Sequence, residues 1–335
     1  MIRSPEGMTE TPNRGFAMDA LSDVLRISHL SGGVFLHAEF TAPWCVSARM
    51  TPELCAPFLS PATHLIPYHY VVEGELYVRV EGEEPLLLRD GEVILFPRND
   101  MHFLGSDLKL KPTIVRDLMT PPEGDGLYDI HYGGGGTTSR MICGYLGCDS
   151  AYENPVIATL PAMMRFKMED AGPAEWIRST FQYAANEIAE GRPGSETVLA
   201  KLSELLFVEA VRRYAENLPE SQTGWLAGLR DPAVARTLAL MHSDVARGWS
   251  MEVLCGEVGA SRSALADRFT RLIGMPPMQY LAHWRMQVAA QRLKGTNTPL
   301  ARIAELVGYE SEAAFSRAFK KAFGTAPATW RRSAG

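Results

Sequence analysis

The spacing of the hydrophobic residues changes along this chain, and each change predicts a different kind of element. Residues 18–27 have apolar positions at helical spacing and predict a short opening helix. From there to about residue 160, short runs rich in β-branched and aromatic residues are separated by turn signals such as Glu73-Gly74 and Asp90-Gly91. Several short strands at close spacing predict an antiparallel sandwich or barrel. The predicted strands include residues 34–40, 64–72, 75–80, 85–88 and 92–96.

Two helices are predicted next, because apolar residues recur at three- and four-residue steps in 174–190 and 195–217. The second helix is apolar over more than half of its circumference, and a helix that is apolar on two sides must bury both. We expect one side to pack on the β domain and the other on a second copy of the chain. Packing of that second side on 174–190 is the alternative. The apolar positions are Leu202, Leu205, Leu206, Phe207, Val208, Ala210 and Val211.

The last hundred residues contain one pattern twice. Each copy has a Val-Gly turn, a Phe, a Gly five residues after that Phe and a Pro three residues after that Gly. Each copy predicts a short helix, a glycine turn and a second amphipathic helix that ends in Gly-x-x-Pro. This is a helix-turn-helix, whose second helix lies in a DNA major groove. The copies are Val258-Gly259, Phe269, Gly274 and Pro277, then Val307-Gly308, Phe319, Gly324 and Pro327.

The two motifs, about 251–272 and 300–321, also predict which side chains face DNA. Ser261 is the expected N-cap of the first recognition helix, and residues 280–293 predict a rigid helix that joins the motifs, with Trp284 as core anchor. Leu265, Phe269, Leu272, Phe315 and Phe319 are expected to face inward. The outward candidates for DNA contact are Arg262, Ser263, Ala266, Asp267, Thr270, Arg271, Glu312, Ala313, Ser316, Arg317 and Lys320.

The residue types in this set have distinct expected roles. Arg and Lys bind guanine edges or phosphates, while Asp and Glu accept hydrogen bonds from cytosine. Most protein–DNA hydrogen bonds go to the backbone, so Arg317, Lys320 and Lys321 are expected to contact phosphates rather than bases.

The distribution of charge supports a nucleic-acid partner for the C-terminal part. The whole chain has a net charge of −6, but residues 224–335 have 15 Lys+Arg against 8 Asp+Glu, a net charge of +7. The rest of the chain is therefore acidic, which indicates two modules with different partners. Five cysteines are sparse and odd in number, no apolar run is long enough to span a membrane, and the N-terminus has no signal core. We expect a cytoplasmic protein.

The C-terminal part resembles the AraC/XylS family of transcription regulators. The segment 274–289 looks like the joint between that family's two motifs. The segments 303–309 and 315–327 are similar to its C-terminal signature. The resemblance covers about 225–332 and implies a seven-helix domain with two recognition helices. Asp267 and Glu312 place acids near positions that the family often uses for base contact.

The N-terminal part resembles the cupin sensor found in one subgroup of that family. The spacing of Gly91, Pro97, Asn99 and His102 matches the second cupin motif, with Asn99 where glycine is usual. His69 and Glu73 or Glu75 lie in the region of the first motif. The run 133–136 and the segment 143–148 add to a resemblance that extends over about 19–149.

The cupin resemblance implies that His69, Glu73 and His102 bind a divalent metal such as iron, manganese or zinc. The usual His-x-His pair is absent, and a hydrogen-bonded core histidine is the alternative. Cys143 and Cys148, with His131 upstream, suggest a thiol or zinc switch, against the alternative of small buried cysteines. The candidates for effector binding are His64, Tyr68, His69, Tyr70, Glu73 and His102.

These patterns predict a multidomain protein of α and β structure. The expected domains are a cupin-like antiparallel β-barrel at 1–170, a helical dimerisation segment and linker at 171–222, and an all-α double helix-turn-helix domain at 223–335.

The expected function is sequence-specific regulation of transcription under the control of a small-molecule effector, or of a metal or redox signal. The regulator would be a homodimer that binds promoter DNA and, as an activator, RNA polymerase, with no cofactor required and no catalytic activity. The alternative is a metal-dependent cupin oxygenase or isomerase with a tethered DNA-binding domain.

Overall fold

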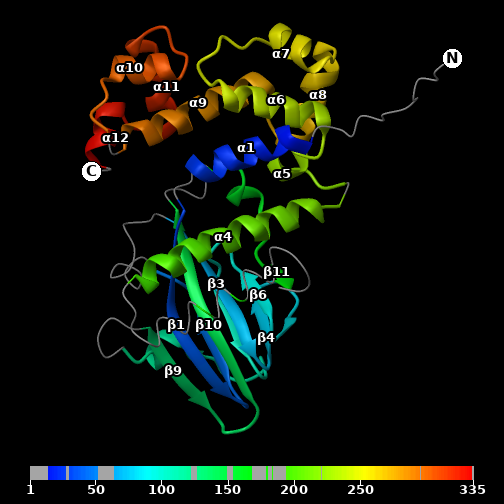
Figure 1. Cartoon of the computed structure of the whole chain (residues 1–335), viewed down its shortest axis with the longest axis vertical. Coiled ribbons are helices and arrows are strands. Elements are labelled where there is room, and N and C mark those ends of the chain that lie inside the picture. Colours follow the sequence, from blue (N-terminus) through cyan, green and yellow to red (C-terminus); the bar gives the residue numbers. More distant parts are fainter. Residues whose placement is uncertain are drawn as a thin grey trace, which may run out of the picture. The chain divides into compact units, whose positions relative to one another are not determined.

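The structure, a computed structural model, describes residues 14–27, 30–51, 64–121, 127–148, 154–167, 179, 183, 194–219, 221–294 and 296–333. These residues form two compact units (Figure 1). The β unit covers residues 28–217. The helical unit comprises the segment up to Ile27 and the residues from Leu218 onward. Among the described helices, none is long and apolar enough to cross a membrane.

The larger sheet of the β unit has its six strands in the order β11-β6-β3-β10-β1-β9. β10 is antiparallel to both β1 and β3, whereas β9 runs parallel to β1. The strands are β1 (Ser31–Thr41), β3 (His64–Glu73), β6 (Glu92–Leu95), β9 (Tyr128–Gly133), β10 (Thr138–Cys148) and β11 (Met164–Lys167).

The second sheet has the order β5-β4-β7-β2-β8, and β8 runs parallel to β2. The sequence predicts an antiparallel barrel, but the described strands form two open sheets, each with one parallel pair. Parallel neighbours need long connections rather than hairpins, and residue spacing does not reveal them. The strands are β2 (Cys45–Ala48), β4 (Glu75–Val80), β5 (Leu86–Arg89), β7 (His102–Gly105) and β8 (Thr113–Ile114), with 3₁₀ turns η1 (Val115–Leu118) and η2 (Ile157–Thr159).

The predicted strands and turns are confirmed where hydrophobic alternation was clear. The runs at 34–40, 64–72, 75–80, 85–88 and 92–96 correspond to β1, β3, β4, β5 and β6. Gly74, between β3 and β4, has φ +84°, and a Cβ there would lie 2.5 Å from the carbonyl oxygen of Thr138. Glycine is therefore required at this turn for its backbone conformation and for space.

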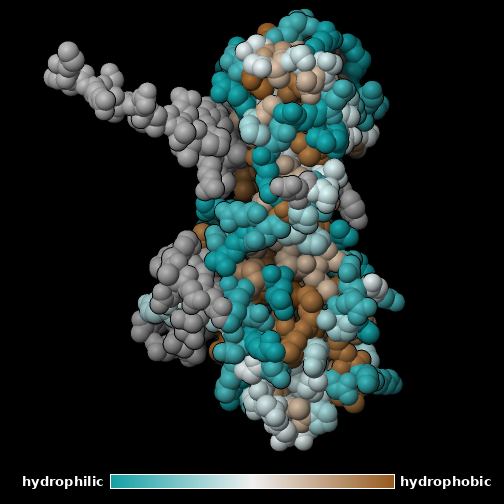
Figure 2. All heavy atoms as spheres, turned by 90° about the vertical axis from the view of Figure 1, so that its right-hand side faces the viewer, coloured by the Kyte–Doolittle hydropathy of each residue, from teal (hydrophilic) through white to brown (hydrophobic). Residues whose placement is uncertain are grey.

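The hydrophobic core of the β unit draws residues from both sheets. Phe40 and Trp44 stack with ring centroids 4.0 Å apart, and Ile94 and Tyr145 are fully buried. Figure 2 shows that apolar residues also reach the surface of this unit as a strip between polar ones.

Helix α4 (Ser195–Glu216) lies across the face of β1, as Figure 1 shows. Gly32 of β1 allows this approach, because a Cβ there would lie 2.5 Å from Cβ of Ser203. The helix predicted at 195–217 is confirmed. Of the helix predicted at 174–190, the structure describes only Ser179 and Tyr183, both helical.

The helical unit contains the two repeated motifs and also helix α1, although the sequence assigns that segment to the sensory domain. α1 packs against α6 and contacts α9, and its side chains Ala20, Leu21 and Val24 are buried. The described helices of this unit are α1 (Arg14–Ile27), α5 (Trp225–Gly228), α6 (Pro232–Ser243), α7 (Met251–Val258), α8 (Arg262–Ile273), α9 (Pro277–Leu293), α10 (Leu300–Leu306), α11 (Glu312–Phe323) and α12 (Pro327–Ser333).

Helix α9 contributes to the core of both motifs. In the middle of this helix, Trp284 is buried and stacks on His242 of α6 with centroids 3.8 Å apart. Near its end, Leu293 belongs to a cluster with Phe315 and Phe319 of α11. The predicted joining helix and the predicted role of Trp284 are therefore confirmed.

Candidate functional site

The first motif has the local signals that the sequence predicts. Gly259 adopts φ +72° between α7 and α8, and the Ser261 side chain accepts a hydrogen bond from the Ala264 amide at the start of α8. Leu265 and Phe269 are buried. A buried face fixes the rotation of a helix, so the opposite face of α8 is turned to solvent.

The second motif repeats this arrangement. Gly308 has φ +77° after α10, and the Ser311 side chain accepts a hydrogen bond from the Ala314 amide at the start of α11. Phe315 and Phe319 are fully buried. The same cap and the same inward aromatic positions therefore orient both second helices of the repeat.

Every residue predicted to contact DNA lies on the outer side of one of these two helices. Ala266, Thr270 and Ser316 are half-buried beside the core, whereas the others are exposed. The exposed residues are Arg262, Ser263, Asp267, Arg271, Glu312, Ala313, Arg317 and Lys320.

Some basic side chains of the helical unit form ion pairs within the protein, whereas others remain available to bind DNA. Arg268 Nε lies 3.5 Å from Oδ2 of Asp231, and the Asp231 carboxylate also caps α6. This ion pair therefore links α8 to α6. Arg262 forms an exposed pair with Glu252 at 2.7 Å. Arg271 and Lys320 form no ion pair with any described residue. Water screens an exposed pair and leaves it little net strength, so Arg262 can exchange its partner for DNA at small cost.

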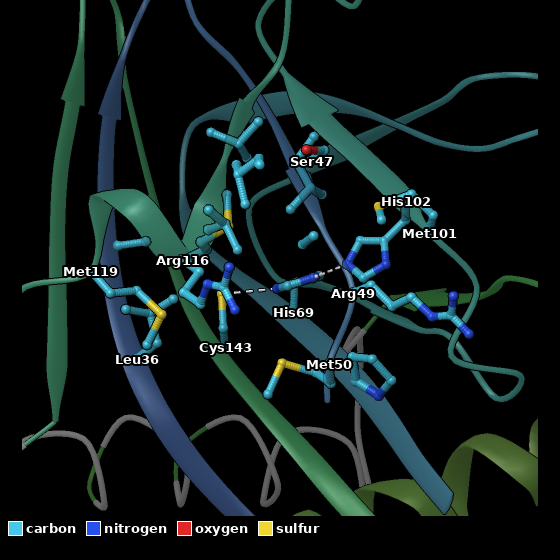
Figure 3. Close-up of a pocket in the computed structure, with 18 of the residues that line it drawn as sticks. Leu36, Ser47, Arg49, Met50, His69, Met101, His102, Arg116, Met119 and Cys143 are labelled. Atoms are coloured by element: carbon cyan, nitrogen blue, oxygen red, sulfur yellow. Dashed lines mark hydrogen bonds between the residues drawn. The ribbon is translucent and has the colours of Figure 1, made fainter. Parts of the chain in front are cut away.

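The β unit contains a cavity of about 240 Å³ between its two sheets (Figure 3). The described residues of its wall come from β1, β2, β3, β7, β8, β10, η1 and adjoining loops, and most of them are apolar. They include Leu36, Ala38, Phe40, Val46, Met50, Leu104, Val115, Met119 and Met141, together with the polar residues His69, His102, Cys143 and Arg116.

Three polar side chains in the cavity wall form a continuous hydrogen-bonded chain. His69 Nδ1 lies 2.9 Å from Cys143 Sγ, and His69 Nε2 lies 3.0 Å from His102 Nε2. His102 Nδ1 lies 3.0 Å from the carbonyl oxygen of Asp100. Figure 3 shows His69 between the other two side chains.

The geometry of this chain assigns its protons. A carbonyl oxygen only accepts, so His102 Nδ1 carries hydrogen and His102 Nε2 accepts from His69 Nε2. His69 Nδ1 then accepts from the Cys143 thiol. Burial lowers the pKa of His69 well below its ordinary value, lowers the pKa of His102 to about 4, and raises the pKa of Cys143. All three groups are therefore neutral at neutral pH. Each ring N–H and the thiol S–H is donated to the next member of the series Cys143, His69, His102 and the Asp100 carbonyl.

Of the residues predicted to bind an effector, the structure brings only His69 and His102 to the cavity. Strand alternation turns Tyr68 and Tyr70 to the other face of β3, where Tyr68 Oη lies 2.7 Å from Ser203 Oγ of α4. His64 Nε2 contacts the carbonyl oxygen of Pro97 at 2.6 Å. The exposed Glu73 forms an ion pair with Arg140.

The same alternation separates the predicted metal and thiol residues. Cys143 and Cys148 are five positions apart on β10, so their side chains point to opposite faces, and His131 is exposed on β9. His69 and His102 share one hydrogen bond, and Glu73 is not beside them. In the described ranges, no three His, Cys, Asp or Glu side chains are grouped to hold a metal ion. The residues present do not fit the metal centre that the cupin resemblance implies.

Sequence reasoning did not find most of the cavity. Arg116 and Met119 lie at a 3₁₀ turn that has no periodic pattern, and Met101 precedes a four-residue strand. Cys143 was found, but as the possible partner of Cys148. The sequence signal that could have found it is the alternation of side chains between the two faces of a strand. Once 138–148 is taken as a strand beside 64–73, the register pairs Cys143 with His69.

Two family models match the chain. The model described as Cupin matches residues 19–216, and the model described as Helix-turn-helix domain matches residues 254–333. The first match alone covers more than half of the chain.

Similar curated proteins extend over nearly the whole chain. A putative AraC-like transcription regulator of Streptomyces lividans is 32% identical over 321 residues, which are 94% of this chain and 98% of that protein. The HTH-type transcriptional regulator AlkR of Acinetobacter baylyi is 26% identical, over 94% of this chain and 99% of its own length. The RCS-specific HTH-type transcriptional activator RclR of Escherichia coli is 23% identical, over 94% and 97%.

Solved structures resemble the C-terminal part. One is the DNA-binding domain of AdpA in complex with a target DNA, at 26% sequence identity and a TM-score of 0.30, covering 31% of this chain and 92% of that one.

Proposed function

The chain belongs to the AraC-type transcription regulators that have a cupin domain before a helix-turn-helix DNA-binding domain, and we propose that a small molecule bound in the β-unit cavity controls its binding to promoter DNA. The observation that carries this proposal is the cavity itself. Largely apolar pockets with a few convergent polar groups are typical of small-molecule sites. This cavity of about 240 Å³ has that composition.

The DNA-binding part of the proposal assigns α8 and α11 as the helices that read two successive major grooves. Both have a buried aromatic face and an outer face with exposed basic residues. Successive turns of one DNA face are about 34 Å apart, so the two half-elements should be about 10 bp apart. Arg262 and Arg271 are assigned to bases, and Arg317 and Lys320 to phosphates.

Strand β1 offers a covalent route from the cavity to the helical unit. It supplies Leu36, Ala38 and Phe40 to the cavity wall. β1 begins at Ser31, four positions after α1 ends at Ile27, and α1 packs against α6. A ligand that shifts β1 would act on the strand that follows α1 in the sequence, and through this connection would bias the conformations of the DNA-binding helices.

We also propose that the regulator is a homodimer through α4. Leu202, Leu206 and Phe207 are buried in the β unit, which accounts for one apolar side of this helix. Val198 and Leu205, at the i and i+7 positions of the other side, are 41% and 36% exposed. A second α4 would cover them and bring two DNA-binding units to one promoter.

The proposal treats the cavity as a sensor, without catalysis and without a required cofactor. The imidazoles of His69 and His102 already hydrogen-bond to each other and to their neighbours, so neither is positioned as a free base. Binding of promoter DNA assigns the protein to the cytoplasm, with RNA polymerase as its partner at an activated promoter.

A selected-DNA binding assay with the full chain tests this function. We expect a site with two half-elements about 10 bp apart, an affinity that falls steeply with salt, and a shift of that affinity when small molecules extracted from cells are added. DNA binding that stays constant with every extract would contradict effector control, and binding that is insensitive to salt would contradict the interface.

A further inference from the structure

We propose that the ligand of the β-unit cavity is an organic acid with an apolar body, bound with its carboxylate at Arg116. This inference rests on the proposed function and names the chemistry of its effector.

The size of the cavity limits the ligand to a small molecule. An apolar protein cavity of about 150 Å³ holds benzene, and pockets for drug-sized ligands begin at about 300 Å³. The cavity of about 240 Å³ lies between these values. It therefore suits a single substituted ring or a medium-length alkyl chain.

The part of the wall formed by Cys143, His69 and His102 favours an apolar group of the ligand. The thiol hydrogen of Cys143 and the ring N–H groups of His69 and His102 are all donated along one series of hydrogen bonds, which ends at the carbonyl oxygen of Asp100. A ligand hydroxyl or amide placed there would lack a partner unless it broke this chain, and an unsatisfied buried polar group costs about 1–3 kcal/mol. Leu36, Phe40 and the other apolar side chains of the wall offer dispersion contacts instead.

The formal charges around the cavity are positive. Its described wall contains no Asp or Glu, and its two histidines are engaged in hydrogen bonds with Cys143, with each other and with a backbone carbonyl, which leaves Arg49 and Arg116 as the charged residues. Figure 3 shows the Arg116 guanidinium turned toward the cavity and the Arg49 guanidinium turned away from it. Arg116 forms no ion pair with a described residue. A guanidinium pairs best with a planar carboxylate, through two parallel hydrogen bonds.

The outer part of the cavity wall also favours a ligand that is both apolar and anionic. Met101 and Ile114 belong to the wall but are 41% and 53% exposed. Ile114 is two residues from Arg116 in the chain. An apolar body that extends from the inner wall would cover these side chains and bring its carboxylate to Arg116.

Calorimetric titration of the full-length protein with matched ligands tests the inference. The probes are octanoate and phenylacetate, each compared with its neutral analogue, octanol and phenylethanol. We expect at least one acid to bind, with an affinity about tenfold or more above that of its alcohol, because a charge-assisted pair is lost in the alcohol.

Two arginine variants locate the carboxylate. Arg116→Met should reduce the affinity for the acid to about that of the alcohol and leave the affinity for the alcohol unchanged. Arg49→Met is the matched control, because it removes the same charge from a side chain that points away from the cavity, and it should leave both affinities unchanged. Both side chains are exposed, so neither variant is expected to impair folding.

Several outcomes would overturn the inference. These are equal binding of acid and alcohol, absence of binding by both acids, or loss of acid selectivity in Arg49→Met but not in Arg116→Met. A separate promoter-binding assay keeps the two proposals apart. An acid that binds through Arg116 without changing DNA affinity would contradict effector control and leave the ligand chemistry intact.

Discussion

The guanidinium of Arg285 lies against the backbone of Gly308, so closely that a Cβ at position 308 would be 2.6 Å from Arg285 Nη2. Arg285 is on α9, and its Nε and Nη2 donate to the carbonyl oxygens of Val245 and Arg247 at 3.0 and 2.8 Å. These carbonyls precede the first motif, whereas Gly308 is the turn of the second. One side chain therefore ties both motifs together and contributes to the distance between α8 and α11.

The first prediction concerns this contact. Gly308→Ala should lower the free energy of unfolding by about 1 kcal/mol or more for its φ of +77°, and should also displace the second motif from Arg285. We expect lower affinity for a DNA site with two half-elements and unchanged affinity for the first half-element alone. Fluorescence anisotropy with the two DNA fragments measures this.

The matched control is Gly259→Ala. Gly259 is the turn glycine of the first motif, has φ +72°, and has nothing within 4 Å of its Cβ position. Its substitution should have a similar cost in stability without a selective loss on the two-element site. Equal DNA-binding defects in the two variants would mean that the Arg285 contact does not set the spacing.

The second prediction separates base readers from phosphate contacts. Arg271→Ala should relax specificity at one base pair, at a cost of about 1–3 kcal/mol for the preferred base, because its exposed guanidinium lies on the outer face of α8. Lys320→Ala should weaken all sequences about equally and reduce the salt dependence. Binding measured against a panel of single-base variants tests both. Relaxed specificity at a single position in Lys320→Ala would show that α11 is rotated differently on DNA.

The third prediction concerns pH and the helical unit. His242 is buried, its Nε2 lies 2.8 Å from Tyr280 Oη, and burial lowers its pKa to about 3. The unfolded chain, with an ordinary histidine pKa of about 6.5, takes up this proton first, so stability is lost as pH falls below about 6.5. This group alone should remove about 2 kcal/mol by pH 5.

Hydrogen exchange of the α6 and α9 amides as a function of pH measures that loss within the helical unit. His242→Phe preserves the stacking on Trp284 but removes the titrating group. The variant should therefore show a shallower decline between pH 6.5 and 5. An identical decline in both proteins would assign the acid sensitivity to other groups.

The fourth prediction concerns the dimer. Leu205→Glu should convert the full-length protein to a monomer with weakened promoter binding, because Leu205 lies on the exposed apolar side of α4. Leu206, although adjacent, is fully buried, so a charge there would disrupt the β unit instead. Sedimentation velocity of the variant and of the unmutated protein measures the result.

The matched control for the dimer is Thr197→Glu. It adds the same charge at an exposed position of α4, about 100° around the helix from Val198 and so away from the line that joins Val198 to Leu205. This variant should sediment like the unmutated protein. A monomeric unmutated protein at tens of micromolar would rule the dimer out.

Residue spacing in the sequence determined the parts of this protein that are formed by local interactions. The two motifs, their Ser261 and Ser311 caps, the inward Phe269 and Phe319 and the outward basic residues all follow from helical periodicity and capping chemistry, which act within a few residues. The strands from β3 to β6 were predictable for the same reason, since alternation and turn glycines are also local.

Only the tertiary structure decided the site in the β unit and the membership of α1. The cavity joins His69 on β3, His102 on β7, Cys143 on β10 and Arg116 on η1, and these come together through strand order, parallel crossovers and register. Alternation along a strand places Tyr68 and His69 on opposite faces, and likewise Cys148 and Cys143. Which of the two faces lines the cavity is decided only by the neighbouring strands. Likewise, α1 is an amphipathic helix by sequence, and the surface that it covers is fixed by packing against α6, more than two hundred residues later in the chain.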